Sequence, residues 1–180
     1  MRDRYKVVCL ALQYGMAART LARNLKDTIP EAREMIRQHR NNFRTFWAWL
    51  EGAVDHAALS KSIETVFGWR MLVTDKTKRG TLLNYPMQSN GAEMMRLAAI
   101  YGIEAGIEIC CPIHDAFLIC APSSEIEEAV AKMQDIMARA SRVVLGDLSL
   151  RSDAKVYHYP DRYVPEGGEA MWDRVQRLVH

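Results

Sequence analysis

The spacing of hydrophobic residues predicts helices in the first third of the chain and a mixture of strands and helices after it. Gly15 marks a helix end and Pro30 a helix start, because glycine suits a left-handed cap and proline suits the first turn. The predicted helices cover 2–14, 16–25, 30–59 as one helix or two, 87–102, 122–144 and 168–178; the predicted strands cover a hairpin at 62–73 and the stretches 107–113, 117–121 and 148–157. This order indicates an α+β fold with an antiparallel sheet.

Several apolar side chains at helical spacing are predicted to form a core rather than a ligand site. On an amphipathic helix such residues line the face that turns toward the interior. They are Met35, Phe43, Phe46, Trp47 and Leu50 in the third predicted helix, and Met87, Met94, Leu97 and Ala98 in the fourth. The helix at 122–144 is expected to begin with a serine cap and to run from acidic to basic residues, which suits the helix dipole.

Composition indicates an ordinary folded protein of one domain, or of one domain and part of another. Hydrophobic residues make up 49% of the 180 residues, and no apolar run approaches the roughly 20 residues that span a bilayer. We therefore expect no membrane partner. The cysteines show no CxxC spacing, and we expect them to be reduced core residues of a cytoplasmic protein. They are Cys9, Cys110, Cys111 and Cys120.

A four-residue spacing joins Arg2, Lys6, Leu10 and Tyr14 into one slowly turning stripe on a helix of about 3.6 residues per turn. Cations at a helix start oppose the dipole, and like charges four residues apart repel each other. A bound polyphosphate would reverse both effects. Two interpretations stay open from the spacing alone: a phosphate-binding face, or a solvated basic face.

The stretch RDRYKVVCLALQYGMAARTLARNL resembles the fingers helix of family A DNA polymerases, the bacterial DNA polymerase I type. That motif reads Arg, three residues, Lys, seven residues, Tyr-Gly, and every spacing matches here. The resemblance implies that Arg2 binds the phosphates of the incoming nucleotide and that Lys6 holds them and protonates the pyrophosphate leaving group. It also implies that Tyr14 shapes the pocket of the nascent base pair. Leu10 departs from the aromatic residue that is usual at its position.

A second candidate lies at His114 and Asp115, between the strands predicted at 107–113 and 117–121. Aspartate is common at turns, and a carboxylate on a rigid hairpin also suits the metal ions that phosphoryl transfer needs. The stretch CPIHDAFLICAP resembles the His-Asp hairpin of the palm in the same family. The resemblance implies that Asp115 binds the two catalytic Mg²⁺ ions and that His114 lies near the primer terminus. Ala116 stands where a glutamate is usual.

Two further stretches extend the resemblance. LLNYPMQSNGAEMMRLAAI resembles the family's Asn, three residues, Gln segment, so Asn84 and Gln88 would contact primer-template DNA; taken as bare residues, they favour helix-start caps. ETVFGWR resembles the Gly-Arg hairpin before that segment, with Trp69 in place of a basic residue. The resemblance predicts a helical, fingers-like segment with a hairpin at 1–83 and a partial palm at 84–180, which together form an incomplete polymerase fold.

The resemblance implies DNA-templated nucleotidyl transfer, with dNTP and primer-template DNA as partners. In this family the other metal-binding aspartate lies in a palm strand before the fingers helix, and the given sequence starts at that helix. We therefore expect weak or no activity from these residues alone, and a second chain or an upstream segment that supplies this aspartate. The open palm edge is also expected to lead to binding of a partner or to aggregation.

Two alternative functions stay open. One is a non-catalytic, nucleic-acid-binding remnant that keeps the basic helix and the primer-template contacts. The other is a fragment of a single-subunit RNA polymerase, which shares the Lys and Tyr of the fingers helix and a His-Asp turn. The segment NYPMQSNGAEMM favours the DNA enzyme.

Overall fold

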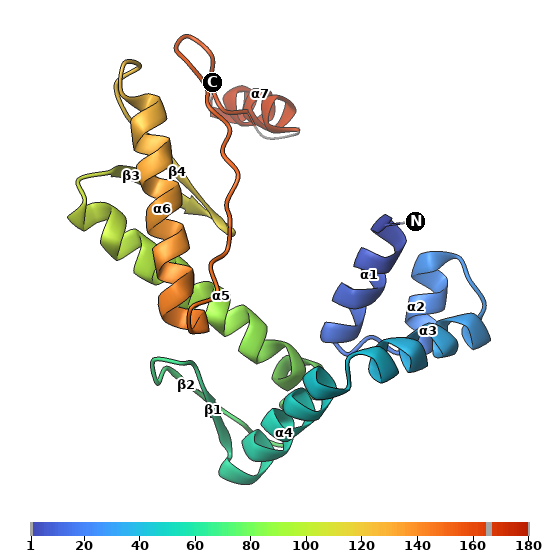
Figure 1. The fold of residues 1–180 in the computed structure, drawn as a ribbon. Coiled ribbons are helices and arrows are strands. Elements are labelled where there is room, and N and C mark those ends of the chain that lie inside the picture. Colours follow the sequence, from blue (N-terminus) through green and yellow to red (C-terminus); the bar gives the residue numbers. More distant parts are fainter. Residues whose placement is uncertain (1, 165–166, 180) are drawn as a thin grey trace. The chain divides into compact units, whose positions relative to one another are not determined.

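The computed structural model describes residues 2–164 and 167–179, with side chains from Tyr5 onward. It forms two compact units, Met1–Arg96 and Leu97–His180, which are described separately below. The first contains α1 (Arg2–Gln13), α2 (Ala18–Leu25), α3 (Ile29–Asn42), α4 (Arg44–Ser60), β1 (Ser62–Glu64), β2 (Arg70–Leu72) and most of α5 (Arg79–Glu104) (Figure 1). The second contains the end of α5, β3 (Glu108–Ile113), β4 (Ala116–Cys120), α6 (Ile126–Leu145) and α7 (Gly168–Val179).

The predicted helical region at 30–59 forms two helices, which decides between the two possibilities. Thr28 caps α3: its hydroxyl accepts a hydrogen bond from the Glu31 amide, and its own amide donates to the Glu31 carboxylate. Such a capping box satisfies donors that lack partners in the first turn. Phe43 leaves the helical conformation, with φ −118° and ψ 49°, and separates α3 from α4.

The core of the first unit gathers apolar side chains from α1 to α5. Leu21 and Leu50 are fully buried, and Trp47 is buried beside them. Met35 and Phe46 pack against this core, as predicted. The prediction for Phe43 is wrong, because the break between α3 and α4 leaves its side chain 51% exposed.

Helix α5 begins eight residues before the predicted start, and Pro86 lies inside it. Proline lacks an amide hydrogen and usually ends or kinks a helix. Here Leu82 and Leu83, in the turn before Pro86, are buried in the core, so tertiary packing holds the residues before the proline in the helix. Asn84 and Gln88 therefore lie within the helix and are not helix-start caps.

The second unit packs one face of a β3–β4 hairpin with α5 and α6. Its core contains Ala98, as predicted, together with Ile107, Met133, Ile136 and Ala140. The strands are antiparallel, with Ile113 opposite Ala116 and an irregular register between Ile109 and Cys111. The first unit has its own antiparallel pair, β1–β2, so the predicted α+β fold is confirmed. Met87, Met94 and Leu97 are half-buried.

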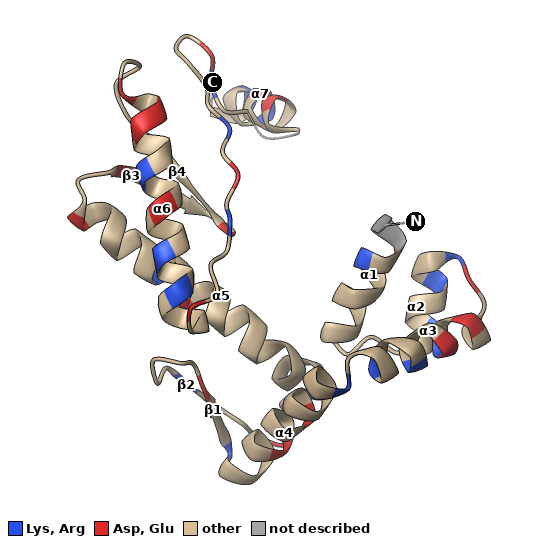
Figure 2. Ribbon diagram, viewed as in Figure 1, with Lys and Arg blue, Asp and Glu red and all other residues tan. Residues whose placement is uncertain are grey.

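Helix α6 follows the predicted charge order, with acidic residues in its first turn and Arg142 in its last (Figure 2). The predicted serine cap is wrong: Glu125 occupies the N-cap position, and its side chain makes no capping hydrogen bond. The prediction that the cysteines are core residues is also wrong for Cys110, Cys111 and Cys120, which are exposed on the hairpin; Cys9 is half-buried. All four are free thiols.

The stretch predicted as a strand at 148–157 is irregular. Side chains of α6 hold it instead of a neighbouring strand. The Gln134 amide donates to the Ser152 carbonyl at 2.8 Å, and the Leu150 amide donates to the Ser141 hydroxyl at 2.9 Å. An alternating sequence forms a strand only where a ladder partner exists, and the described residues provide none here. None of the helices in the described part of the chain is long and apolar enough to cross a membrane.

Candidate functional site

The predicted phosphate-binding stripe lies on the exposed side of α1. Val8, Ala11 and Leu12 are buried in the core of the first unit. Helical geometry then turns the stripe away from the core, and Lys6, Leu10 and Tyr14 are all exposed. The side chain of Arg2 lies outside the described residues. The structure thus keeps the described part of the stripe open to a ligand.

Tyr14 is positioned by the C-terminal cap of α1. The Gly15 amide donates to the Leu12 carbonyl and the Met16 amide to the Ala11 carbonyl, both at 2.9 Å. This pair of hydrogen bonds is a Schellman motif, which needs a residue of positive φ after the helix. Gly15 supplies it with φ +70°. The Tyr-Gly pair in the sequence is therefore a helix end that fixes where the tyrosine lies.

A close approach between α1 and α5 brings Tyr14 near the start of α5. A Cβ atom added at Gly80 would lie 3.0 Å from the Tyr14 carbonyl oxygen. A Cβ added at Gly15 would lie 3.4 Å from the Gly80 Cα and 3.2 Å from a methyl of Leu83. The Tyr14 carbonyl oxygen and the Gly80 Cα are backbone atoms, which cannot rotate away from an added Cβ as a side chain can. Glycines on both sides therefore allow this approach.

Gly80→Ala is expected to lower the free energy of unfolding by about 1–3 kcal/mol, because the new methyl group overpacks the α1–α5 contact. The matched control is Gly91→Ala in the same helix, where an added Cβ meets nothing within 4 Å. That variant should gain about 0.5–1 kcal/mol from helix propensity. Urea denaturation measures both, and a shift of the same sign in the two variants would contradict the packing argument.

The structure joins Gln88 to Tyr14, two of the residues predicted from sequence. The Gln88 side-chain amide donates to the Tyr14 hydroxyl at 3.0 Å, across 74 positions of sequence. Asn84, one turn earlier on α5, is half-buried. The bond fixes one edge of the stripe with a side chain of α5.

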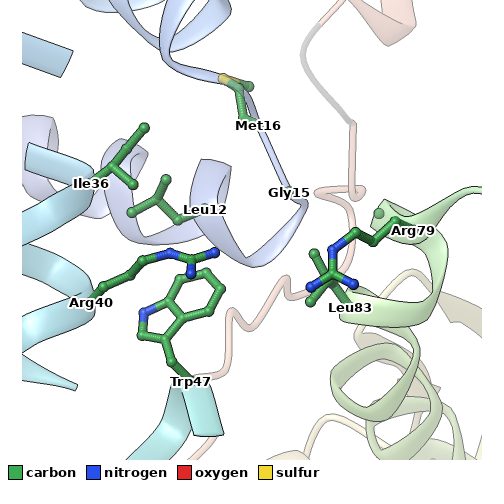
Figure 3. Close-up of a pocket in the computed structure, with 9 residues that line it drawn as sticks. Leu12, Gly15, Met16, Ile36, Arg40, Trp47, Arg79 and Leu83 are labelled. Carbon is green, nitrogen blue, oxygen red and sulfur yellow. The ribbon is translucent and has the colours of Figure 1, made fainter. Parts of the chain in front are cut away.

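A pocket of about 170 Å³ opens beside the C-terminal end of α1 (Figure 3). The Arg40 guanidinium lies over the Trp47 ring, 4.3 Å from its centroid. Arg40 and Arg79 both form ion pairs with Glu51, so α3, α4 and α5 are linked through one carboxylate. These two arginines were not predicted as site residues, since nothing in their spacing distinguishes them from other surface cations.

The β1–β2 hairpin is fastened to α5 by a buried carboxylate, Glu93. Its oxygens accept a hydrogen bond from the Thr65 hydroxyl at 2.5 Å and an ion pair from Arg96. The Thr65 hydrogen bond, followed by the Arg96 guanidinium, lowers the pKa of Glu93 from its ordinary value of 4.5 despite the opposing effect of burial. Glu93 was not predicted, and its place three residues before an arginine is the one sequence hint of this role.

Glu93 should make stability depend on pH in the acid range. A lowered folded-state pKa favours the ionised form, so its contribution is complete above the unfolded value near 4.5 and is lost as the pH falls through the folded value. Glu93→Gln is expected to cost about 1.5–3 kcal/mol at pH 7, the range for hydrogen bonds to charged groups, and clearly less near pH 3. Urea denaturation at both pH values checks this, with the exposed Glu104→Gln as control. A cost that does not change with pH would contradict it.

In the second unit, His114 and Asp115 form the two-residue turn between β3 and β4, as predicted. His114 has φ +53°, a left-handed conformation that costs a residue other than glycine about 1–2 kcal/mol. Both side chains are exposed, and none of the described residues forms an ion pair or side-chain hydrogen bond with Asp115. Strain of this kind often marks functional turns.

The described residues alone do not fit a complete magnesium site. Mg²⁺ needs oxygen ligands in near-octahedral geometry, usually with more than one acidic group in a two-metal site. Within the described ranges, no three His, Cys, Asp or Glu side chains come together in a way that could hold a metal ion. Asp115 offers one carboxylate, and Ala116 beside it offers none.

Comparison with known proteins decides the family. The model of the protein family described as "DNA polymerase family A" matches residues 1–158. The chain belongs to DNA polymerase family A. This family A chain is 27% identical to the thermostable DNA polymerase I of Thermus filiformis over 153 residues, which are 78% of the chain and 18% of that polymerase. It is also 27% identical to DNA polymerase I of Geobacillus stearothermophilus over 175 residues, 88% of the chain and 19% of that polymerase.

A solved structure supports the same assignment. The POL domain of Pol1 from M. smegmatis, in complex with DNA primer-template and dNTP, matches with a TM-score of 0.68 and 26% identity over 77% of the family A chain and 27% of that chain. The predicted resemblance to the C-terminal part of a family A DNA polymerase is thereby confirmed, and its division into fingers and palm stays a prediction. The chain spans about a fifth of the length of the two polymerases named above. The predicted boundary at 83/84 stays a prediction; the compact units divide after Arg96.

Proposed function

We propose that this family A chain contributes the nucleotide-binding helix and one carboxylate to a site of DNA-templated nucleotidyl transfer. The observation that carries the proposal is the 3.0 Å hydrogen bond from Gln88 to Tyr14. It links, within one unit, a position assigned by resemblance to primer-template DNA and one assigned to the nascent base pair. Lys6 lies on the same stripe, about 12 Å along the helix from Tyr14 at 1.5 Å per residue. One end of the stripe can then hold phosphates while the other faces the base.

The partners proposed are dNTP and primer-template DNA. Arg2 and Lys6 suit phosphates as a fork-shaped and a point cation, respectively. Asn84, Gln88 and His114 are proposed DNA contacts, listed here with the resemblance as their support. Asp115 is proposed as one ligand in a Mg²⁺ site that takes its remaining carboxylates from a second chain or another polymerase segment.

A direct test combines the purified chain with primer-template, dNTP and Mg²⁺. We expect dNTP to protect Lys6 from amine labelling, and we expect little or no primer extension by these 180 residues alone. Labelling of Lys6 that dNTP does not reduce would contradict nucleotide binding by the stripe. Robust extension would instead contradict the proposed need for further carboxylates.

Asp115→Asn is expected to leave the melting temperature unchanged, because its side chain is exposed and no described residue pairs with it. In any assembly that restores primer extension, the same variant should lose most of that activity. Thermal denaturation and extension assays are run together, with the exposed Asp153→Asn in the same unit as control. An early-melting Asp115 variant, or one with normal extension, would contradict the assigned role.

One observation favours a second candidate, a non-catalytic nucleic-acid-binding chain. The part of the chain that the structure describes gathers no set of three metal-binding side chains. Such a chain would keep the basic helix and the contacts from α5. DNA binding that does not change with dNTP or Mg²⁺ would favour this candidate over nucleotidyl transfer.

A further inference from the structure

The turn of the β1–β2 hairpin exposes large apolar side chains in a short stretch. Trp69 is 70% exposed, and its neighbours Val66 and Phe67 are exposed as well. Single exposed hydrophobic residues are ordinary, but a cluster on one turn indicates a contact surface. Gly68 makes the turn possible with φ +81°. Trp69 also lines a pocket between the hairpin turn and α5, so the exposed surface includes a concave part.

Hydrogen bonds hold Trp69 in place while leaving its ring free. The Trp69 amide donates to the Thr65 hydroxyl at 3.0 Å, and the Tyr85 hydroxyl donates to the Trp69 carbonyl at 3.1 Å. The Thr65 hydroxyl in turn donates to the buried Glu93 at 2.5 Å. The hairpin turn is therefore fixed to α5 at two points. A ring presented on a fixed backbone loses little entropy when a ligand stacks on it.

The pocket beside this ring has a volume of about 360 Å³ and lies between the hairpin turn and α5. That volume falls at the lower end of the range of about 300–1,000 Å³ that is usual for small-molecule sites. Trp69 and Tyr85 supply aromatic surface, while Gln88 and Ser89 supply polar groups. The Gln88 amide nitrogen already donates to Tyr14, and its carbonyl oxygen can accept a hydrogen bond from the edge of a nucleobase.

The pocket's own charged residues, Glu93 and Arg96, pair with each other, so the basic excess comes from the segment around the hairpin and not from the pocket lining. Residues 61–79 carry five basic and two acidic side chains, a net charge of +3. Figure 2 shows both signs of charge along the β1–β2 hairpin. The Arg96 guanidinium, which reaches from α5, lies 5.9 Å from the centroid of the Phe67 ring. Basic residues interleaved with aromatic ones are the usual composition of single-strand binding surfaces.

We propose that this pocket binds one unstacked base of a single-stranded DNA segment, with Trp69 as the stacking surface. The inference rests on the proposed function for its partner class, since it assumes that the chain binds DNA. It goes beyond that function in assigning a site to the hairpin, where Trp69 replaces a basic residue. Because every base can stack on an aromatic ring, the site distinguishes unpaired from paired bases and does not distinguish one base sequence from another.

The test compares two fluorescently labelled strands of equal length and charge, an oligodeoxythymidine and the same strand made of abasic residues, by anisotropy. Trp69→Ala is expected to weaken binding to the base-bearing strand about tenfold, and to leave the abasic strand unchanged. Trp69→Phe should keep most of the affinity. Trp172→Ala, an exposed tryptophan on α7 that is absent from the pocket, is the matched control and should change neither affinity.

A second measurement guards against misfolding. Oligodeoxythymidine should quench the fluorescence of the wild-type chain, and Trp69→Phe should remove that quenching at an unchanged melting temperature. Equal losses on both strands, or no loss on either, would overturn the inference. If dNTP still protects Lys6 while Trp69→Ala has no effect, only this inference fails. If the wild-type chain binds no DNA, the proposed function fails with it.

Discussion

Leu50→Ala is expected to lower the free energy of unfolding of the first unit by about 2–5 kcal/mol. Leu50 is 0% exposed in the core where α4 meets the other helices. Removing its side chain loses the transfer free energy of three carbon atoms and leaves a cavity that the packed helices cannot fill. Folded domains are stable by only about 5–15 kcal/mol, so this single change removes a large part of the total.

The same helix offers a control with the same chemistry. Leu59 is 85% exposed near the end of α4, and Leu59→Ala should change the free energy of unfolding by less than about 0.5 kcal/mol. Urea denaturation followed by tryptophan fluorescence measures both, since Trp47 and Trp49 lie on α4 itself. Similar midpoints for the two variants would mean that the core of this unit is not packed as the structure has it.

The hydrophobic pattern predicted the elements well where local chemistry fixes them. Gly15 ends α1 because a left-handed residue is needed there, and the polar pair His114 and Asp115 marks the turn of the β3–β4 hairpin. Thr28 and Glu31 form a capping box, and α3 begins at Ile29, one residue before the expected helix start at Pro30. In each case the determining interaction lies within a few residues, so the sequence alone contains it.

The pattern failed where distant contacts override local preference. Pro86 predicts a helix start, yet buried leucines before it extend α5 back to Arg79. The alternating stretch at 148–157 predicts a strand, yet a strand needs a neighbour, and side chains of α6 hold the segment instead. Periodicity describes which side of an element is apolar and not which partner covers it.

The candidate site likewise contains residues that the sequence predicted and contacts that it did not. Lys6, Tyr14 and Asp115 were predicted from motif spacing, which a single sequence displays. The Gly80 approach to Tyr14 and the Glu93 hydrogen bonds were not, because they join α5 to segments far away in the chain. A glycine inside a helix gives no local indication of such a contact, and the arginine three residues after Glu93 hints at their ion pair but not at the bond to Thr65. Such positioning contacts are therefore the part of a site that a structure adds.

Lys6→Ala is expected to weaken dNTP binding by about tenfold to a hundredfold, the range for a lost hydrogen bond to a charged group. The exposed ammonium can approach a triphosphate directly, and its removal leaves the core face of α1 untouched. Lys6→Arg separates the two roles that the family resemblance implies. It keeps the positive charge, so nucleotide affinity should largely remain, but guanidinium releases a proton far less readily than ammonium. In an assembly that extends primers, this variant should bind dNTP and transfer it slowly.

Affinity is measured by titrating the chain with dNTP, and Lys155→Ala provides a control that removes an exposed lysine from the other unit. Raising the salt concentration should reduce the affinity of the wild type and of Lys6→Arg more steeply than that of Lys6→Ala, because screening acts on the charge that the alanine variant lacks. A Lys6→Ala chain with the wild-type affinity and the wild-type salt dependence would mean that the stripe on α1 is a solvated basic face. The spacing of four that first suggested a phosphate site would then reflect only the helix repeat.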